Sequence, residues 1–321
     1  MTTLTILTTP HDEVPERLTD LARSGDVEVR IVTADGLAEA LPGTEVLLLW
    51  DFFSTALADT FDRADALRWV HAAAAGVDSL LFDELVDSEV VVTNARGVFD
   101  RPIAEFVLGF LLMHAKSSVA SLDDQRRQRW NRRSTSDLAG TRALVVGTGA
   151  IGREVARVLA ALGVEVVGAG SHARDGDDDF STVIDSRELT AHLSGIDWVI
   201  DVAPLTDRTR GLFDASVFAA MEEHAFFVNV GRGATVETAA LVDALNSGTI
   251  AGAALDVVDV EPLPADHPLW RADNVIITPH MSGDTNGWRM RLADQFVELF
   301  ALHRAGTPFP HTVDKKAGFV R

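Results

Sequence analysis

Cysteine is absent from this chain of 321 residues, and positive charge is scarce. The absence of cysteine excludes disulfides, thiolate metal sites and a thiol nucleophile. There are 28 lysines and arginines against 48 aspartates and glutamates, and a net charge of −20 repels polyanions, so no nucleic-acid partner is expected. For the one basic run, Arg126–Arg133, we expect a solvated helix end or a subunit contact.

Long apolar runs are missing as well. The stretch Phe106–Met113 is broken by Gly109 and stays far below the roughly 20 apolar residues of a membrane helix, so no membrane span is expected. The first residues, Met1–Leu7, contain neither a basic region nor a small-residue cleavage site, and we therefore expect a cytoplasmic protein. Histidines and acids do not stand at ligand spacing, and no metal site is predicted.

Short apolar segments alternate with helix-like ones, a pattern typical of parallel sheets with helical crossovers. In the first part of the chain the predicted strands are Leu4–Thr8, Val27–Val32, Glu45–Leu49, Arg68–His71 and Val90–Thr93. The predicted helices between them are Val14–Ser24, Leu37–Ala40 and Leu80–Val86. In the second part the predicted strands are Ala143–Val146, Val164–Gly168, Trp198–Val202, Ala225–Val230, Gly252–Val257 and Val275–Thr278.

Two helices mark the passages between these parts. One begins at Asp100, which can cap it, with Pro102 in the first turn, and the other covers Trp288–His303. The length of the chain also suggests two domains. We predict an α/β protein with two open parallel-sheet domains, in which residues 100–288 are inserted into a domain made of residues 1–99 and 289–321.

A glycine-rich turn, Gly147–Gly152, lies between a predicted strand and the predicted helix Arg153–Leu162. In a Rossmann domain the first glycine permits a tight turn, the second lets the backbone approach a pyrophosphate, and the third lets helix and strand pack. The helix N-terminus adds N–H groups and a partial positive charge. The inserted domain is therefore predicted to be a Rossmann dinucleotide-binding domain.

The end of the second strand of this domain lacks the acid that usually binds the ribose hydroxyls of NAD. Gly170 stands there, followed by Ser171, His172 and Arg174, whose polar groups suit a 2′-phosphate. The acidic run Asp175–Asp179 opposes this, but we expect its carboxylates to be solvated and screened. NADP(H) is therefore predicted over NAD(H), which stays possible.

Three later strands of the same domain are followed by ionisable side chains. Arg232 comes after one strand, Glu261 comes shortly after Asp256 on the next, and His280 ends the last. Because parallel strands bind ligands at their carboxyl ends, these residues are expected to form one arginine–carboxylate–histidine set.

With these motifs the chain resembles the D-isomer-specific 2-hydroxyacid dehydrogenases, in particular their glyoxylate/hydroxypyruvate reductase-like branch. The resemblance covers essentially the whole chain and also includes Ala74–Asp78, Thr93–Gly97, Ile103–Glu105 and Pro204–Thr206. It implies hydride transfer between NAD(P)H and a small 2-keto acid or D-2-hydroxy acid. It also implies a homodimer and makes residues 1–99 with 289–321 the substrate-binding domain.

The resemblance implies a role for each site residue. His280, paired with Glu261, would be the general acid in reduction and the base in oxidation. Arg232 would bind the substrate carboxylate and polarise the carbonyl, together with the backbone N–H groups of Ala75 and Gly76. The residues expected at the cofactor are Gly147, Gly149, Ala150, Ile151, Gly152, Ser171, His172, Arg174, Ala203, Pro204, Val230, Arg232, Asp256, His280 and Gly283.

Several alternatives stay open on sequence alone. Formate dehydrogenases share the fold but have glutamine where Glu261 stands, which makes formate oxidation unexpected. Phosphite oxidation would keep all three groups, and a nucleotide-sensing binding module without significant turnover is the alternative from another class. A local question concerns Trp50, Phe52 and Phe53, which either complete the core of the first domain or line the substrate pocket.

Overall fold

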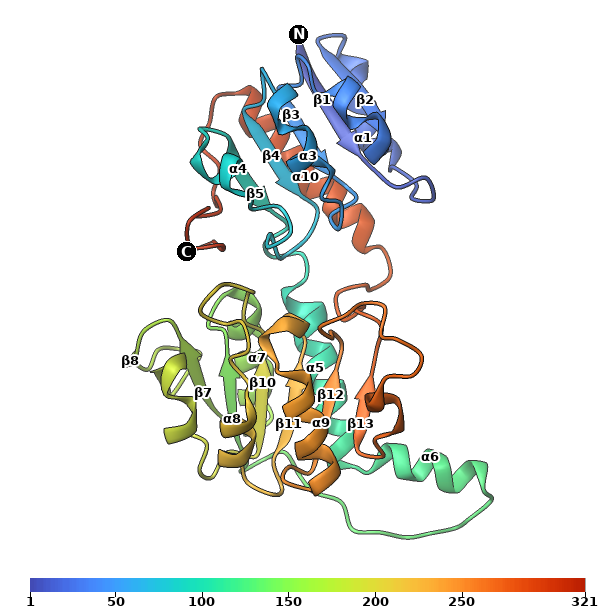
Figure 1. The fold of residues 1–321 in the computed structure, drawn as a ribbon, viewed down its shortest axis with the longest axis vertical. Helices are drawn as coiled ribbons and strands as arrows, with labels where there is room; N and C mark the ends of the chain where they lie inside the picture. Colours follow the sequence, from blue (N-terminus) through green and yellow to red (C-terminus); the bar gives the residue numbers. More distant parts are fainter. Residues whose placement is uncertain (321) are drawn as a thin grey trace. The chain divides into compact units, whose positions relative to one another are not determined.

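The computed structural model describes residues 1–320, which form two compact units. Unit 1 consists of Met1–Phe99 and Asn286–Arg321, and unit 2 consists of Asp100–Thr285, so that unit 2 is inserted into the sequence of unit 1 (Figure 1). The second segment of unit 1 begins at Asn286 rather than at residue 289.

Unit 1 is built on a five-stranded sheet with the order β2-β1-β3-β4-β5, in which every pair of strands is parallel. The strands are β1 (Thr2–Leu7), β2 (Val27–Val32), β3 (Val46–Leu49), β4 (Trp69–Ala72) and β5 (Val91–Asn94). The helices of this unit are α1 (Glu16–Thr19), α2 (Leu37–Ala40), α3 (Ala56–Thr60), α4 (Asp83–Asp87) and α10 (Trp288–Arg304). All five predicted strands are confirmed, with ends that differ by no more than two residues.

The predicted helix Val14–Ser24 is wrong in its length and regularity. Only Glu16–Thr19 is α-helical, and Asp20–Ser24 continues as a tighter 3₁₀ helix. The α-helix starts late because Pro15 is its N-cap. The 3₁₀ segment ends at Gly25, which has the left-handed φ of 74° that glycine tolerates best.

The core of unit 1 contains aromatic side chains between the sheet and α10. Trp69 on β4 is fully buried and stacks on Phe296 of α10, with ring centroids 5.2 Å apart. Thr93 accepts a hydrogen bond from Trp69 Nε1 (2.8 Å), and its hydroxyl lies 2.7 Å from His71 Nδ1. Burial lowers the pKa of His71 to about 3, so this histidine is a neutral core residue.

The aromatic group after β3 divides between core and surface. Trp50 is only 3% exposed and belongs to the core, so for this residue the core alternative holds and not the pocket alternative. Phe53 is 63% exposed, and Phe52 packs against Phe53 and against Trp288 at the start of α10. Substrate contact therefore stays a prediction for Phe52 and Phe53 alone.

Unit 2 is built on an eight-stranded sheet with the order β13-β12-β11-β10-β6-β7-β9-β8, in which only β8 is antiparallel to its neighbour. The strands are β6 (Arg142–Val146), β7 (Glu165–Gly170), β8 (Arg174–Asp175), β9 (Thr182–Asp185), β10 (Trp198–Asp201), β11 (Phe226–Asn229), β12 (Gly252–Leu255) and β13 (Val275–Ile277). The helices are α5 (Asp100–Ala115), α6 (Ser118–Arg126), α7 (Ala150–Ala160), α8 (Ala215–Ala220) and α9 (Thr238–Ser247).

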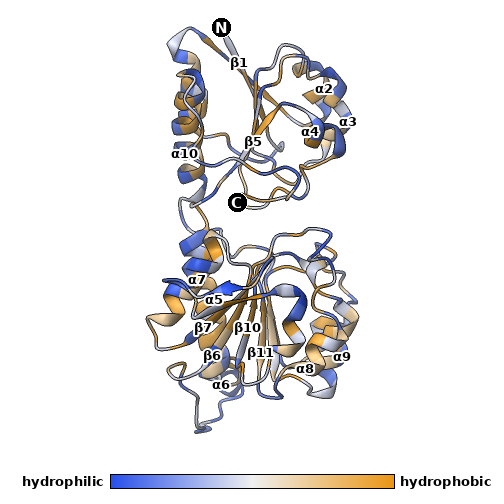
Figure 2. Ribbon diagram, turned by 90° about the vertical axis from the view of Figure 1, so that its left-hand side faces the viewer, coloured by the Kyte–Doolittle hydropathy of each residue, from blue (hydrophilic) through white to orange (hydrophobic). Residues whose placement is uncertain are grey.

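The central strands of this sheet are mostly apolar, as Figure 2 shows for β7, β10 and β11. All residues of β10, β11 and β12 are buried, as expected for a parallel sheet covered on both faces. The six predicted strands are present, whereas β8, which has only two residues, and β9, which follows the acidic run, were not predicted. Together these two units confirm the predicted α/β class with two open, largely parallel sheets and a Rossmann-type second unit.

Among the described residues, no single helix is long and apolar enough to cross a membrane. Only the pair α5 and α6, bent by 62° relative to each other, has the length and apolar composition of a membrane span when the two helices are taken together.

Candidate active site

The glycine-rich turn after β6 has the geometry of a dinucleotide site. Gly147 has a φ of +108°, and a Cβ there would lie 2.8 Å from the Val202 carbonyl oxygen. A Cβ on Gly152 would lie 1.8 Å from the Gly147 carbonyl oxygen, so the third glycine is required by packing. A Cβ on Gly149 would instead meet nothing within 4 Å, which leaves room beside the backbone for a pyrophosphate.

The helix after this turn begins earlier than predicted, at Ala150 instead of Arg153. Gly149 is its N-cap with an extended backbone, and no side chain of the described residues forms a capping hydrogen bond there. The first N–H groups of α7 are therefore available to an anion, and Ala150 and Ile151 supply two of them. These features fit the pyrophosphate of NAD(P).

The end of β7 presents polar groups on the surface. Ser171 Oγ lies 3.0 Å from His172 Nδ1, and both residues are exposed. Arg208, on the loop after β10, donates from Nη2 to the Ser171 carbonyl oxygen (3.2 Å). Sequence reasoning missed Arg208, although its place shortly after Pro204–Thr206 in a strand-end loop was a signal that could have identified it.

The acidic run next to these groups is not simply solvated, which corrects the expectation from the sequence. Asp179 accepts from Arg153 (2.7 Å) and from Arg157 (2.7 Å), and its side chain is only 6% exposed. Asp177 accepts from Arg153 (2.9 Å) and from Arg174 (3.2 Å), and the hydrogen bond from Arg153 lowers the pKa of Asp177 to about 2. Arginine pairing, rather than solvent screening alone, therefore offsets these two charges, and it also occupies Arg174.

Arg232 lies on a turn after β11 that is held by buried side chains. Asn229 accepts the Gly231 N–H at Oδ1 (2.9 Å) and donates from Nδ2 to the Arg232 carbonyl oxygen (3.1 Å). Arg232 Nη1 donates to the Gly231 carbonyl oxygen (2.8 Å). A Cβ on Gly233 would lie 1.9 Å from the backbone carbon of Val258, so glycine is needed for the turn to contact the chain that leads to Glu261.

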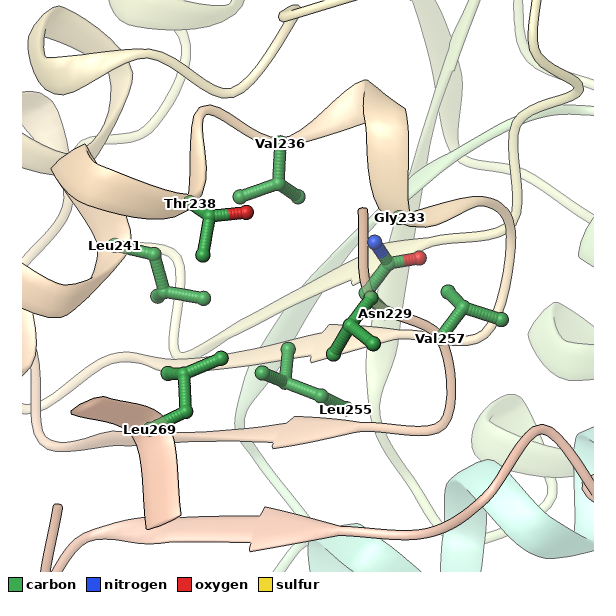
Figure 3. Close-up of a pocket in the computed structure, with 9 residues that line it drawn as sticks. Asn229, Gly233, Val236, Thr238, Leu241, Leu255, Val257 and Leu269 are labelled. Atoms are coloured by element: carbon green, nitrogen blue, oxygen red, sulfur yellow. The ribbon is translucent and has the colours of Figure 1, made fainter. Parts of the chain in front are cut away.

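A small cavity lies behind this turn, and Figure 3 shows Asn229, Gly233 and Val257 at one end of it. Its volume of about 10 Å³ leaves room for no more than one water molecule. The other lining residues are mostly aliphatic, including Leu241 and Leu255. A substrate does not fit there, so the cavity is a packing feature behind the turn that carries Arg232.

The predicted histidine and glutamate are in contact. His280 Nδ1 lies 2.7 Å from Glu261 Oε2, and the two side chains are 30% and 33% exposed. Burial by itself raises the pKa of Glu261, but hydrogen bonds from His280 and from the Val258 N–H and the charge of Arg232 leave this pKa below its ordinary value. The carboxylate holds the imidazole through this contact with Nδ1, which leaves Nε2 as the other ring nitrogen.

Asp256 holds the turn on which His280 lies. Its carboxylate is 2% exposed and accepts from Thr278 Oγ1 (2.5 Å), Met281 N–H (2.9 Å) and Ser282 N–H (2.8 Å). Its carbonyl oxygen accepts the N–H of His280 (2.8 Å), a residue with a left-handed φ of 52°. These bonds stabilise a backbone conformation that non-glycine residues rarely adopt, a function that sequence reasoning did not predict for Asp256.

The remaining predicted residues lie on loops at strand ends. In unit 2, Ala203 and Val230 are buried, whereas Pro204 is exposed. In unit 1, Ala75 and Gly76 follow β4 and are partly exposed, and Asn94 Nδ2 donates to the Ala75 carbonyl oxygen (2.5 Å). That bond fixes the peptide between Ala75 and Gly76, the two residues whose N–H groups were predicted to bind substrate.

Known proteins resemble this chain in sequence and in structure. The model of the D-isomer specific 2-hydroxyacid dehydrogenase, NAD binding domain, matches residues 108–282. A glyoxylate reductase from Aeropyrum pernix is 33% identical over 272 residues, which cover 82% of this chain and 81% of that protein. A solved D-isomer specific 2-hydroxyacid dehydrogenase from Xanthobacter autotrophicus, in complex with NADPH and MES, is 31% identical with a TM-score of 0.85 and covers 99% of this chain and 100% of its own.

A second solved structure is an NADPH-dependent glyoxylate/hydroxypyruvate reductase from Sinorhizobium meliloti in complex with NADP and sulfate. It is 26% identical, has a TM-score of 0.82, and covers 99% of this chain and 100% of its own. The match to the family model spans more than half of the chain and includes the dinucleotide turn and His280. The chain therefore belongs to the D-isomer-specific 2-hydroxyacid dehydrogenases and is an NAD(P)-dependent enzyme of that family.

Proposed function

We propose that this enzyme reduces small 2-keto acids of the glyoxylate and hydroxypyruvate class to D-2-hydroxy acids, with NADPH as the preferred cofactor. The observation that carries the proposal is the 2.7 Å contact between His280 Nδ1 and Glu261 Oε2, in the unit that also holds Arg232 and the dinucleotide turn. A nucleotide-sensing module would not need this acid–base pair. Relatives named glyoxylate reductase and glycerate dehydrogenase support the substrate class.

The residues of this chain divide the work of reduction between them. NAD(P)H, when bound, supplies the hydride to the carbonyl carbon. His280 gives a proton from Nε2 to the carbonyl oxygen, and Glu261 stabilises the imidazolium that must be present beforehand. Arg232 binds the substrate carboxylate and polarises the carbonyl through its planar set of N–H donors, and we assign the N–H groups of Ala75 and Gly76 to the same carboxylate.

A panel of substrates tests the proposed function directly. Glyoxylate, hydroxypyruvate and pyruvate are each supplied with NADPH, and formate and phosphite are each supplied with NADP⁺, while the cofactor absorbance is followed. We expect turnover of the 2-keto acids and none of formate or phosphite. Tight binding of NADPH, seen by fluorescence, without turnover of any acid would favour a binding module instead.

Cofactor choice depends on the groups at the end of β7, and it gives a separate prediction. We assign Ser171, Arg174 and Arg208 to the 2′-phosphate, with His172 beside them, because Arg208 already contacts the Ser171 backbone. A charge-assisted hydrogen bond contributes about 1.5–3 kcal/mol, so NADPH should be preferred over NADH by about tenfold or more. Dissociation constants from fluorescence titration measure this, and equal affinities would refute it.

Two variants separate the contributions of the arginines. Arg208→Ala and Arg174→Ala should each weaken NADPH binding and leave NADH binding nearly unchanged. We expect the larger loss for Arg208, because Arg174 is already paired with Asp177. Arg142→Ala is the matched control. Arg142 pairs with Glu165 where β6 and β7 begin, and the groups assigned to the 2′-phosphate lie where β7 ends.

We also propose that the enzyme is a homodimer that uses α6 and the segment after it. Val119, Leu122 and Trp130 are 41%, 47% and 97% exposed, and Trp130 lies within the arginine-rich run. Exposed aromatic and aliphatic residues next to arginine are typical of protein interfaces. Trp130→Glu should convert the dimer to a monomer in light scattering, whereas Trp270→Glu, at a residue that is 53% exposed, should not. A monomeric unmodified enzyme would contradict the assignment.

A further inference from the structure

A carboxyl group that the proposed mechanism does not use is buried at the end of β10. Asp201 is 0% exposed, its Oδ1 accepts the N–H of Ala203 (2.9 Å), and its Oδ2 lies 2.5 Å from Thr235 Oγ1. Neither of these partners carries a charge. Because an ionised carboxylate is costly to bury without a cation, burial raises the pKa of Asp201 to about 7, although both hydrogen bonds oppose the shift.

The hydroxyl group of Thr235 has one hydrogen atom but lies within hydrogen-bond distance of two oxygen atoms. Thr235 Oγ1 also lies 2.6 Å from the carbonyl oxygen of Arg232, which can only accept. When Asp201 is protonated, its hydrogen is donated to the Thr235 oxygen, and the single hydroxyl hydrogen of Thr235 is donated to the Arg232 carbonyl. A protonated Asp201 completes a continuous chain of donors, whereas an ionised Asp201 would leave one hydrogen for two acceptors.

This chain of hydrogen bonds ends at Arg232, the residue that we assign to binding of the substrate carboxylate. The Arg232 carbonyl oxygen accepts hydrogen bonds from Thr235 Oγ1 (2.6 Å), from Asn229 Nδ2 (3.1 Å) and from the Thr235 N–H (3.2 Å), and Asn229 and Thr235 are fully buried. These contacts, of which the one from Oγ1 is the shortest, fix the peptide that follows the Arg232 Cα, and the direction of the guanidinium depends on that backbone. A small rotation of this peptide would move the end of the long side chain.

We propose that Asp201 is a positioning residue, which acts through Thr235 to fix the backbone of Arg232 and thereby to orient its guanidinium toward the substrate carboxylate. The inference rests on the substrate-binding role of Arg232 proposed above. Asp201 touches no reacting atom. Its effect is on the orientation of Arg232. Loss of the hydrogen-bond chain therefore raises KM for the 2-keto acid and lowers kcat, because even a small misplacement of a binding group slows the reaction.

Thr235→Val tests the chain, because it replaces the hydroxyl with a methyl group of the same size. We expect kcat/KM for glyoxylate to fall about tenfold to a hundredfold. The dissociation constant of NADPH, measured by fluorescence, should change less than about twofold, because the Ala203 N–H keeps its partner. Unchanged kcat/KM in a folded Thr235→Val enzyme would overturn the proposal.

Two further variants separate positioning from simple stability. Asp201→Asn keeps a donor for Thr235 and an acceptor for Ala203, so it should retain most of the activity, and a loss as large as that of Thr235→Val would contradict the donor role. The double variant Asp201→Leu with Thr235→Val removes both polar groups from the core. Because Asp201→Leu also leaves the buried Ala203 N–H without its acceptor, the double variant should unfold at a lower temperature than Thr235→Val, whereas its kinetic loss should match that of Thr235→Val. Full activity in the double variant would show that Asp201 and Thr235 only form hydrogen bonds with each other and do not position Arg232.

Arg232→Ala distinguishes failure of this inference from failure of the proposed function. An inactive Arg232→Ala enzyme combined with a fully active Thr235→Val enzyme overturns only the positioning role of Asp201. Turnover that survives Arg232→Ala overturns the role of Arg232 itself, and the inference with it.

Discussion

Replacing His280 with alanine should lower kcat for a 2-keto acid by about 10²–10⁴-fold, the loss typical of a missing general acid. The imidazole is placed for this function by Glu261 at 2.7 Å and by a backbone held on Asp256. Steady-state kinetics with saturating NADPH measure the loss. His224→Ala, which removes an exposed histidine that pairs with Asp197, is the control and should leave kcat unchanged.

Glu261→Gln should give a smaller loss with a different signature. The amide keeps the size of the side chain but removes the negative charge next to the imidazolium. The limb of the pH–rate profile that reports the general acid should therefore move to lower pH, because the protonated imidazole loses its anionic partner. A His280→Ala enzyme with near-normal kcat, or an unshifted profile in Glu261→Gln, would remove that residue from the mechanism.

The second large effect concerns stability, and it follows from the buried carboxyl of Asp201. Burial raises the pKa of this group from 3.8 to about 7 in the folded enzyme. The folded state therefore binds the proton more tightly than the unfolded state, so the contribution to stability is complete below pH 3.8 and is lost as the pH rises through about 7. Across that range the loss amounts to about 4 kcal/mol.

Asp201→Asn should abolish this dependence, because an amide does not titrate. Urea unfolding at about pH 5 and about pH 8 should show the variant gaining about 2–3 kcal/mol relative to the unmodified enzyme as the pH rises. His71, whose pKa is lowered to about 3, has the opposite pH dependence, but it is present in both proteins and cancels in the comparison. A difference between the two proteins that does not change with pH would refute the prediction.

Much of this protein could be predicted from local sequence patterns. Strands such as Val46–Leu49 are apolar and buried along their length, and a parallel sheet covered on both faces needs such segments. The turn Gly147–Gly152 combines a left-handed backbone with a close helix–strand contact, and both features require glycine. Arg232, Glu261 and His280 each follow a strand of the same parallel sheet, and from that order along the chain they were predicted to lie at one edge, where the structure places His280 in contact with Glu261.

Only the tertiary structure decided which polar groups meet. The same acidic and arginine residues could have been solvated, but the fold brings Asp179 against Arg153 and Arg157 and neutralises it. Asp201 has the local pattern of an ordinary strand end, and its pKa is raised because the fold buries it completely, with Thr235, far away in sequence, as a hydrogen-bond partner. Burial and hydrogen bonding are sums over neighbours from distant segments, so composition and spacing along one segment do not contain them.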